Sequence, residues 1–395
     1  MSQPHSSLLA FLESSRPAFI ADLAALVNCD CGTPDKAGVD SMARWFETRC
    51  AEWGWQVETL PQPRYGDCVV ARLAGRKADG KRVMLIGHLD TVYPLGIAAQ
   101  RPMKLAGDKI IGPGTCDIKG GLLVGLYAVR ALQHMLGDGL LDEMAELVFF
   151  FNSEEEVGSP ISQALYSPIA QQMDAVLVLE AARANGDVVS ARKGVANYQL
   201  RVFGKSAHAG VEPEKGANAI LELAHRIVAL HALNGIAPGV TVNVGVIQGG
   251  TRPNVVPDEA WVEVDVRAVD MAGALQVQAA IQHLARQPVT VVGTRVQLAG
   301  SFGFMPMAKT PPIAHLVELV QQSAQALGFE VNDAATGGVS DANKMAELGV
   351  PVLDGLGPVG GLDHGPNEYI EASSIAPRSA LLALLIQKII AEKVS

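Results

Sequence analysis

A histidine and an aspartate follow a predicted strand in the first quarter of the chain, and both residue types can build a metal site. The apolar run 83–86 predicts a buried strand that ends just before His88 and Asp90. Ligands of open α/β sheets bind beyond the carboxyl ends of strands, where His88 is expected. Residues two apart in extended chain share a face, so Asp90 can orient the imidazole toward a metal. The alternative is a strand that ends in two ordinary polar residues.

An aspartate also stands in a glycine-rich loop that precedes a helical pattern. Residues 111–121 read IGPGTCDIKGG and include Asp117. The loop lacks the third glycine of a dinucleotide fingerprint, and Lys119 is not followed by Ser or Thr, so phosphate binding is disfavoured. A carboxylate in such a loop can instead bridge two cations through its two oxygens. We therefore assign Asp117 as a shared metal ligand.

Three consecutive glutamates follow the apolar run 146–151. Neighbouring residues in extended chain point to opposite sides, so one carboxylate can bind metal while the next accepts a proton from water. We assign Glu155 as the general base and Glu156 as a metal ligand. An acidic cap on the following helix is the alternative, because acids are favoured near helix N-termini.

Two further residues complete a candidate metal centre. Glu180 ends the apolar run 175–179, and His364 lies in a late loop. Each of two metals can then have one histidine and one terminal glutamate, with one aspartate shared between them. Such a set suits two zinc ions about 3.5 to 4 Å apart that act on water. The predicted ligands are His88, Asp117, Glu156, Glu180 and His364.

The composition excludes several classes of protein. The chain has 395 residues and a formal net charge of -10, which favours two domains and disfavours a nucleic-acid partner. No run reaches the roughly 18 apolar residues of a membrane span, and the first residues show no secretory signal, so a cytoplasmic protein with no membrane partner is expected. The five cysteines are odd in number and unpatterned, which argues against a disulfide framework.

The elements that must position these residues alternate between strands and helices. Helical patterns at 8–27, 40–53 and 118–132 and strands at 67–73, 82–86, 146–151 and 175–179 predict an α/β sheet covered by helices. From about residue 192, strands at 196–203, 241–247, 260–267 and 294–298 enclose helices at 217–233 and 272–286. This β-α-β-β-α-β order is the ferredoxin-like plan. Helices at 312–327 and 374–393 follow, so we expect a catalytic domain (1–191 and 303–395) with an inserted domain (192–302).

These motifs resemble a family of two-zinc metallopeptidases and deacylases that includes bacterial glutamate carboxypeptidase, acetylornithine deacetylase, succinyl-diaminopimelate desuccinylase and aminoacylase. The similarity spans nearly the whole chain, and its wording is most similar to the glutamate carboxypeptidase branch. It rests on the segments 88–91, 112–121, 154–158, 204–210, 249–257 and 363–365 together with Glu180. The resemblance implies an α/β/α zinc-exopeptidase-like catalytic domain and an inserted ferredoxin-like dimerisation domain.

The resemblance also implies roles for residues outside the ligand set. Asp90 orients His88, and Glu155 is the catalytic base. His208 is similar to the family histidine that reaches the partner subunit's active site and helps to hold the developing oxyanion; without the resemblance it reads as an ordinary turn histidine. The substrate-binding candidates are Asn254, Arg267 and Ser340.

Two departures from the family bear on specificity. Glutamate carboxypeptidase has a lysine soon after the strand equivalent to the one before Glu180, and an arginine in the loop leaving the inserted domain. This chain has Val188 near the first position and the apolar segment 301–305 at the second. Arg183, Arg192 or Lys193 can compensate, but an apolar or aromatic C-terminal side chain is at least as plausible a substrate group as glutamate.

The sequence thus predicts a zinc-dependent metallocarboxypeptidase or amidohydrolase, with cobalt or manganese as other metals. Its substrate is a short peptide or N-acyl amino acid with a free carboxylate, from which it releases the C-terminal amino acid as a homodimer. The alternative is an N-acyl amino acid deacylase of the acetylornithine deacetylase or aminoacylase type. A non-catalytic metal-binding relative is the third interpretation.

Overall fold

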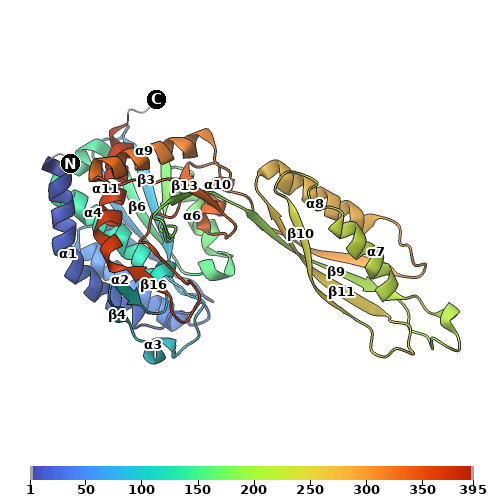
Figure 1. Cartoon of the computed structure of the whole chain (residues 1–395). Coiled ribbons are helices and arrows are strands. Elements are labelled where there is room, and N and C mark those ends of the chain that lie inside the picture. Colours follow the sequence, from blue (N-terminus) through green and yellow to red (C-terminus); the bar gives the residue numbers. More distant parts are fainter. Residues whose placement is uncertain (1–2, 393–395) are drawn as a thin grey trace. The chain divides into compact units, whose positions relative to one another are not determined.

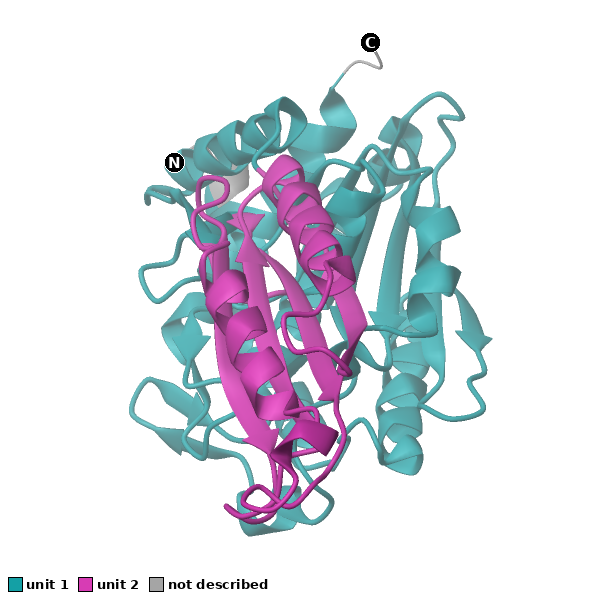
Figure 2. Ribbon diagram, turned by 90° about the vertical axis from the view of Figure 1, so that its right-hand side faces the viewer, with its two compact units in different colours: residues 1–190, 309–335, 340–395 teal, residues 191–308, 336–339 magenta. Residues whose placement is uncertain are grey.

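The computed structural model describes residues 3–392, which form two compact units (Figures 1 and 2). The second unit comprises residues 191–308 and 336–339, and the first unit comprises the rest of the described chain. Both units combine helices and strands, so the predicted α/β class is confirmed.

A six-stranded sheet forms the centre of the first unit, in the order β1-β2-β6-β3-β7-β14. Its strands are β1 (Gln56–Leu60), β2 (Cys68–Ala74), β3 (Lys81–His88), β6 (Met144–Asn152), β7 (Ala175–Val178) and β14 (Val352–Leu353). The last four are parallel to one another, whereas β1 and β2 run antiparallel to their neighbours. His88 pairs with Asn152, and Ile86 pairs with Val178. The carboxyl ends of β3, β6 and β7 therefore meet at one edge of the sheet.

Helices cover both faces of this sheet, as Figure 1 shows. Side chains of successive residues in β6 point to opposite faces. Phe151 stacks on Phe46 of α2 (Lys36–Glu52) with ring centroids 4.6 Å apart, whereas Phe150 contacts Tyr166 of α6 (Ser162–Ala170) with ring centroids 5.6 Å apart. The first face carries α1 (Gln3–Val27), α2 (Lys36–Glu52), α4 (Gly120–Leu136), α9 (Pro311–Leu327) and α11 (Ile375–Ala391), and the second carries α6 (Ser162–Ala170) and α10 (Asp341–Glu347). This is an α/β/α sandwich.

The helix α11 is apolar almost all round because it is a core helix. The segment Ala372–Ala391 is long and apolar enough to cross a membrane, but 72% of its most apolar window is buried inside the protein. It contacts α1, α4, α9 and β3. A helix that packs on several sides needs no polar face. The last residue of the predicted helix 374–393 lies outside the described residues.

Short elements in the first unit connect the loops that follow the main strands. A small sheet in the order β15-β16-β5-β4 consists of β4 (Lys104–Ala106), β5 (Lys109–Ile111), β15 (Gly360–Gly361) and β16 (Tyr369–Glu371). It joins the chain just before Asp117 to the loop that carries His364. Further helices are α3 (Ile97–Gln100), α5 (Gly139–Glu143) and the short η1 (Thr115–Lys119), η2 (Glu155–Val157) and η4 (Ala372–Ser374). A two-stranded sheet of β8 (Val188–Arg192) and β13 (Asp333–Thr336) continues at its ends into the second unit.

The second unit is a four-stranded antiparallel sheet with two helices. Its elements are β9 (Gly194–Phe203), α7 (Ala219–His231), β10 (Thr241–Gly249), β11 (Glu259–Ala268), α8 (Met271–Arg286) and β12 (Arg295–Phe304). Asn218 and Asp270 cap the two helices by accepting the N–H groups of Leu221 and Gly273. The spatial order β10-β11-β9-β12 and the chain order β-α-β-β-α-β are those of the ferredoxin-like plan.

The strand β12 is longer than the sequence predicts. The sequence predicts a strand over 294–298 and a loop over 301–305. Instead Ser301 pairs with Asn197 and Phe302 pairs with Ala196, and the register shifts before Phe304. The glycine at 303 lies at this irregularity and weakens the alternating pattern by which strands are predicted. The side chain of Phe302 packs against the core of the second unit.

Candidate metal centre

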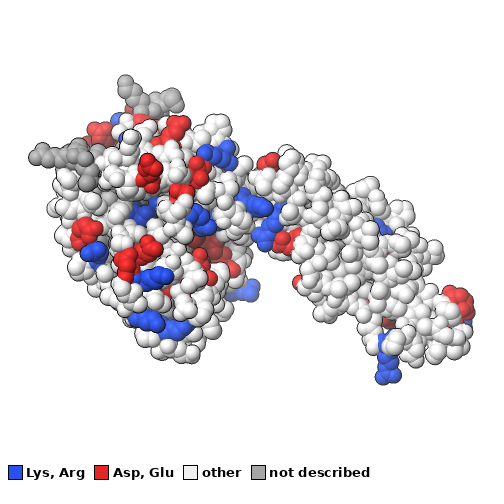
Figure 3. Space-filling view, in the orientation of Figure 1, with Lys and Arg blue, Asp and Glu red and all other residues white. Residues whose placement is uncertain are grey.

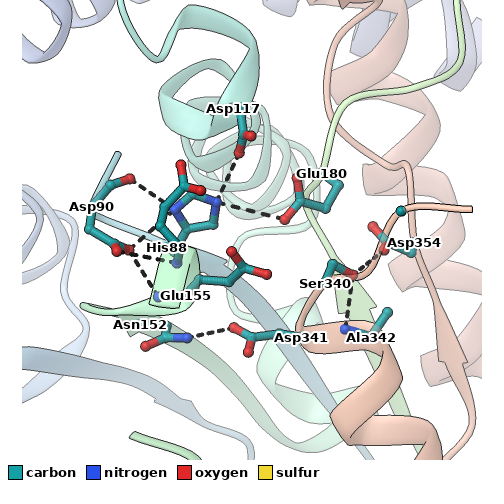
Figure 4. A network of polar contacts seen from close by, with 12 residues as sticks. His88, Asp90, Asp117, Asn152, Glu155, Glu180, Ser340, Asp341, Ala342 and Asp354 are labelled. Carbon is teal, nitrogen blue, oxygen red and sulfur yellow. Dashed lines mark hydrogen bonds and ion pairs between the residues drawn. The ribbon is translucent and has the colours of Figure 1, made fainter. Parts of the chain in front are cut away.

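The two ring nitrogens of His88 face different partners at the end of β3 (Figure 4). The imidazole is buried, and Nδ1–H donates to the backbone carbonyl of Asp90 at 2.9 Å, with Asp90 Oδ1 at 3.4 Å. Nε2 lies 2.9 Å from Asp117 Oδ1 and 3.8 Å from Glu180 Oε1. One nitrogen is therefore held by Asp90 while the other faces two carboxylates, which is how a histidine ligand is usually oriented.

Asp117 lies between two histidines. Its Oδ1 is 2.9 Å from His88 Nε2, and its Oδ2 is 3.0 Å from His364 Nε2. His364 has φ 62°, a left-handed conformation that is uncommon for a residue other than glycine and is often found at functional sites. A carboxylate with one histidine at each oxygen has the arrangement expected of a ligand shared by two cations.

Each histidine has a further carboxylate beside it. Glu180 Oε1 lies 3.8 Å from His88 Nε2, and Glu156 Oε2 lies 3.5 Å from His364 Nε2. Ligand atoms of His88, Asp117 and Glu156 all lie within 4.8 Å of one another. The other oxygen of Glu156 is buried without a hydrogen-bond partner in the part of the chain that the structure describes. The five residues thus form two sets that share Asp117, each with one histidine and one glutamate.

The crowding of these charges shifts the pKa values of the cluster. Burial disfavours the imidazolium of His88, but hydrogen bonds with Asp117 and Asp90 raise its pKa well above the usual value. The hydrogen bond with Asp117 raises the pKa of His364 to about 9, and burial raises the pKa of Glu156 to about 7. Burial also opposes ionisation of Asp117, but the two histidines hold its pKa below the usual value. The cluster therefore attracts cations, and bound metal ions would replace the imidazolium protons.

Asp90 organises the loop that presents the neighbouring glutamates. It is buried, and its Oδ1 accepts the N–H of Glu155 at 3.1 Å, while its Oδ2 accepts the N–H of Glu156 at 3.3 Å and the hydroxyl of Thr33 at 2.7 Å. The same carboxylate thus supports both the His88 imidazole and the 154–157 turn. Thr33 was not predicted, because a single threonine in an N-terminal loop has no sequence signal.

The three consecutive glutamates have different environments. Glu154 is buried, and its Oε1 accepts the N–H groups of Ile161 and Ser162 at the start of α6. The acidic-cap interpretation therefore applies to Glu154. In Figure 4 the carboxylate of Glu155 points into the space bordered by His88 and Glu180.

The side chain of Glu155 has the properties of a proton acceptor. Burial raises its pKa well above the usual value, although the charge of His88 opposes the shift. A carboxylate with a raised pKa binds a proton more readily, which suits a general base that later acts as an acid.

The side chain of Ser340 forms hydrogen bonds with neighbouring protein groups. Ser340 is buried, and its hydroxyl group donates to Asp354 Oδ2 at 2.7 Å. Its own Oγ accepts the N–H of Ala342 at 3.1 Å (Figure 4). This serine caps α10 in a capping box with Asn343. These contacts give Ser340 a structural role, and its substrate contact stays a prediction.

The other predicted substrate-binding residues lie in the second unit, with His208. His208 is exposed, and its backbone forms a bridge with Val255 next to Asn254. Ala209 N–H donates to the carbonyl of Asn254, so the loops that carry His208 and Asn254 are adjacent. Arg267 forms a salt bridge with Asp265 at 2.8 Å and is partly exposed.

The chain is similar to known peptidases and deacylases. The family model described as "Peptidase family M20/M25/M40" matches residues 84–388. Carboxypeptidase G2 of a Pseudomonas species is 31% identical over 388 residues, which cover 96% of this chain and 91% of that protein. N-acetyl-L-citrulline deacetylase of Xanthomonas campestris is 29% identical over 266 residues, which cover 64% of this chain and 68% of that protein.

A solved structure shows the same fold. Aminopeptidase PepT of Bacillus cereus has a TM-score of 0.79 and 23% identity, and the alignment covers 95% of this chain and 98% of that chain. At this identity the likeness concerns the fold alone.

Proposed function

This chain belongs to peptidase family M20/M25/M40, and from that membership we propose that it is a two-zinc amide hydrolase acting on short peptides or N-acyl amino acids with a free carboxylate. The observation that carries the proposal is the pair of histidine and glutamate sets joined through Asp117, with Glu155 beside them. Arranged in this way, the five side chains and the base can serve hydrolysis at two metals.

The donor set fits zinc. Imidazole and carboxylate are common zinc ligands, and the buried, unpartnered Oε1 of Glu156 is a further donor whose burial a metal ion would offset. His88, Asp117 and Glu180 would hold one ion, and His364, Asp117 and Glu156 would hold the other. Two such ions make water more acidic, toward a pKa of about 7, and make the substrate carbonyl more electrophilic. The ligand types also accept cobalt or manganese.

Glu155 would accept the proton of the attacking water and then deliver it to the leaving nitrogen. Its backbone is fixed by Asp90, so its carboxylate has a defined approach to the site. A base that passes its proton on must be neutral for part of the cycle, and the raised pKa of Glu155 lowers the free-energy cost of that state.

The proposed enzyme is a homodimer in which His208 of one subunit stabilises the oxyanion in the site of the other. The surface of the second unit supports self-association. In α7, Glu222 and Arg226 are the only acidic or basic residues besides two histidines, and both are buried. The exposed side of the helices carries Leu221, Val228 and Leu275, which are 50%, 71% and 52% exposed. Figure 3 shows few charges on this unit. Uncharged helical surfaces of this kind are typical of protein interfaces.

The proposed substrate has an apolar or aromatic C-terminal side chain, because two positions that carry cations in glutamate carboxypeptidase are apolar here. Val188 is fully buried in β8, and Phe302 packs against the core of the second unit. Arg192 is also buried, and its guanidinium donates to the carbonyl of Gly338 at 3.1 Å. These residues therefore do not offer a free cation for a glutamate side chain.

An N-acyl amino acid deacylase is the second candidate, and the similarity to the Xanthomonas deacetylase favours it. The two candidates differ in the acyl group and share the metal centre.

The free cysteines, of which only Cys29 is partly exposed, fit the expected cytoplasmic location.

A hydrolysis panel tests the proposal. The zinc-reconstituted protein would be assayed on dipeptides, N-acetyl amino acids and N-aryl-acyl glutamates, with chelator-treated protein as the control. We expect the highest kcat/KM for a substrate with an apolar C-terminal residue. A preference for N-acetyl amino acids over dipeptides would favour the deacylase. A protein that binds two metals and cleaves no amide would refute the function and support a non-catalytic relative.

A further inference from the structure

Glu368 is a buried carboxylate whose two oxygens are both fully engaged. It is 1% exposed. Its Oε1 accepts the N–H groups of Cys116 at 2.8 Å and Asp117 at 3.0 Å, and its Oε2 accepts the N–H of Gly114 at 2.9 Å and the hydroxyl of Tyr93 at 2.6 Å. Four donors thus converge on one carboxylate and give both of its oxygens hydrogen-bond partners, which offsets the cost of burying the group.

Three of these donors belong to the loop that carries the shared ligand. Backbone N–H groups of residues 114, 116 and 117 all point at Glu368, so the carboxylate fixes the path of the chain on both sides of Cys116. Asp117 is the last of them, and its side chain lies between the two histidines. The direction of the Asp117 side chain therefore depends on its backbone contact with Glu368.

Glu368 also belongs to the segment that carries His364. Its backbone carbonyl accepts the N–H of Gly112 at 3.1 Å, and its backbone N–H donates to Gly365. The carbonyl of Gly365 lies 2.9 Å from the hydroxyl of Tyr93 and accepts from Arg101 at 3.3 Å. The glycine-rich loop and the His364 loop are thus held together at a single buried group.

We propose that Glu368 is a positioning residue of the metal centre, which holds Asp117 and His364 at the separation that two metal ions require. The inference rests on the proposed two-metal function. Glu368 is not itself a ligand, because both of its oxygens are buried and occupied by protein donors. A glutamine at this position has one acceptor oxygen and one NH2 group, which would face N–H groups of the loop. The loop would then lose part of its hydrogen bonding and the charge that orders it.

The test compares three variants of the full-length protein. Glu368→Gln removes the charge and one acceptor, and Tyr93→Phe removes one donor without adding a charge mismatch. Glu371→Gln, on β16, is the matched control, because it makes the same change outside this cluster of hydrogen bonds. The readouts are amide hydrogen exchange of the 112–119 loop in metal-free protein, zinc affinity by chelator competition, and the visible absorption spectrum of the cobalt-substituted protein.

We expect Glu368→Gln to accelerate exchange in the loop, to weaken zinc binding by about 10- to 100-fold, and to change the cobalt spectrum. Tyr93→Phe should do the same to a smaller extent, and Glu371→Gln should resemble the wild type. Unchanged affinity and spectrum in both Glu368→Gln and Tyr93→Phe would overturn the inference, even if their stability fell. If the wild type itself does not bind two metals, the proposed function fails instead, so the two failures are distinguishable.

Discussion

Replacement of Asp90 by asparagine tests whether this residue supports the 154–157 turn in addition to the His88 imidazole. The carboxylate accepts three hydrogen bonds, from Thr33, Glu155 and Glu156, and lies near the His88 ring. In Asp90→Asn, the amide oxygen can keep the Glu155 N–H. The NH2 group then replaces Oδ2, where the Thr33 hydroxyl can rotate to accept from it but the N–H of Glu156 cannot.

The magnitude follows from these contacts. The partly buried N–H of Glu156 loses its acceptor, at a cost of about 1 to 3 kcal/mol, and the remaining bonds lose their charge assistance, at about 1 kcal/mol. We expect the free energy of unfolding of the first unit to fall by about 2 to 4 kcal/mol. His88 Nδ1 also donates to the backbone carbonyl of Asp90 at 2.9 Å, and this contact survives the substitution. Zinc affinity should therefore fall only by about tenfold, the lower end of the usual range.

The measurements are chemical unfolding, zinc affinity and kcat of the metal-saturated enzyme, with Asp67→Asn as the control. Asp67 also accepts a backbone N–H, that of Gln62, and it accepts a hydrogen bond from the ammonium group of Lys36. It is not among the predicted ligands or their partners. The control should lose stability without losing kcat per bound metal, whereas Asp90→Asn should lose both. If Asp90→Asn loses its zinc while the enzyme that remains loaded keeps its full kcat, the assignment of Asp90 to the glutamate turn is wrong.

Two further predictions concern the second unit. Burial opposes ionisation of Glu222, but two backbone N–H groups and Arg226 lower its pKa. The ionised carboxylate therefore stabilises the folded protein fully above the unfolded pKa of about 4.3, and this stabilisation is lost as the pH falls through the folded pKa. Glu222→Gln should therefore lower the free energy of unfolding by about 3 kcal/mol at pH 7. Below about pH 4.3 the stability of the variant should fall less steeply with pH than that of the wild type. An unchanged unfolding curve would contradict this. Mixing inactive His208→Ala and Glu155→Ala chains should restore partial hydrolysis through heterodimers, and no recovery despite demonstrated subunit exchange would exclude a site shared between subunits.

The sequence predicts the main residues of the site because they follow strand ends. His88 and Glu180 come after buried runs, and parallel strands end at the same edge of a sheet. The structure brings Glu180 and Asp117 to the same ring nitrogen of His88, as this topology allows. Periodicity also predicts the β-α-β-β-α-β order of the second unit, because alternation and helical spacing are strong over long segments.

The supporting residues are harder to predict because their contacts are distant in sequence and involve the backbone. Glu368 binds N–H groups about 250 positions earlier in the chain, and no side-chain pattern marks those donors. Thr33 donates its side-chain hydroxyl to Asp90, 57 positions later, and a single threonine carries no sequence signal for such a contact. Ser340 shows the opposite case, since the structure gives it a helix-capping role that the sequence does not predict, while its substrate contact stays a prediction.

The most direct test of the two-metal hydrolase is the metal content and turnover of Glu155→Ala. The account predicts two metal ions per subunit, as in the wild type, and a kcat that is lower by about 10²- to 10⁴-fold or more, because the base is lost while the ligands remain. Loss of metal together with activity would mean that Glu155 is a ligand, and full activity with two metals bound would mean that it is not the base.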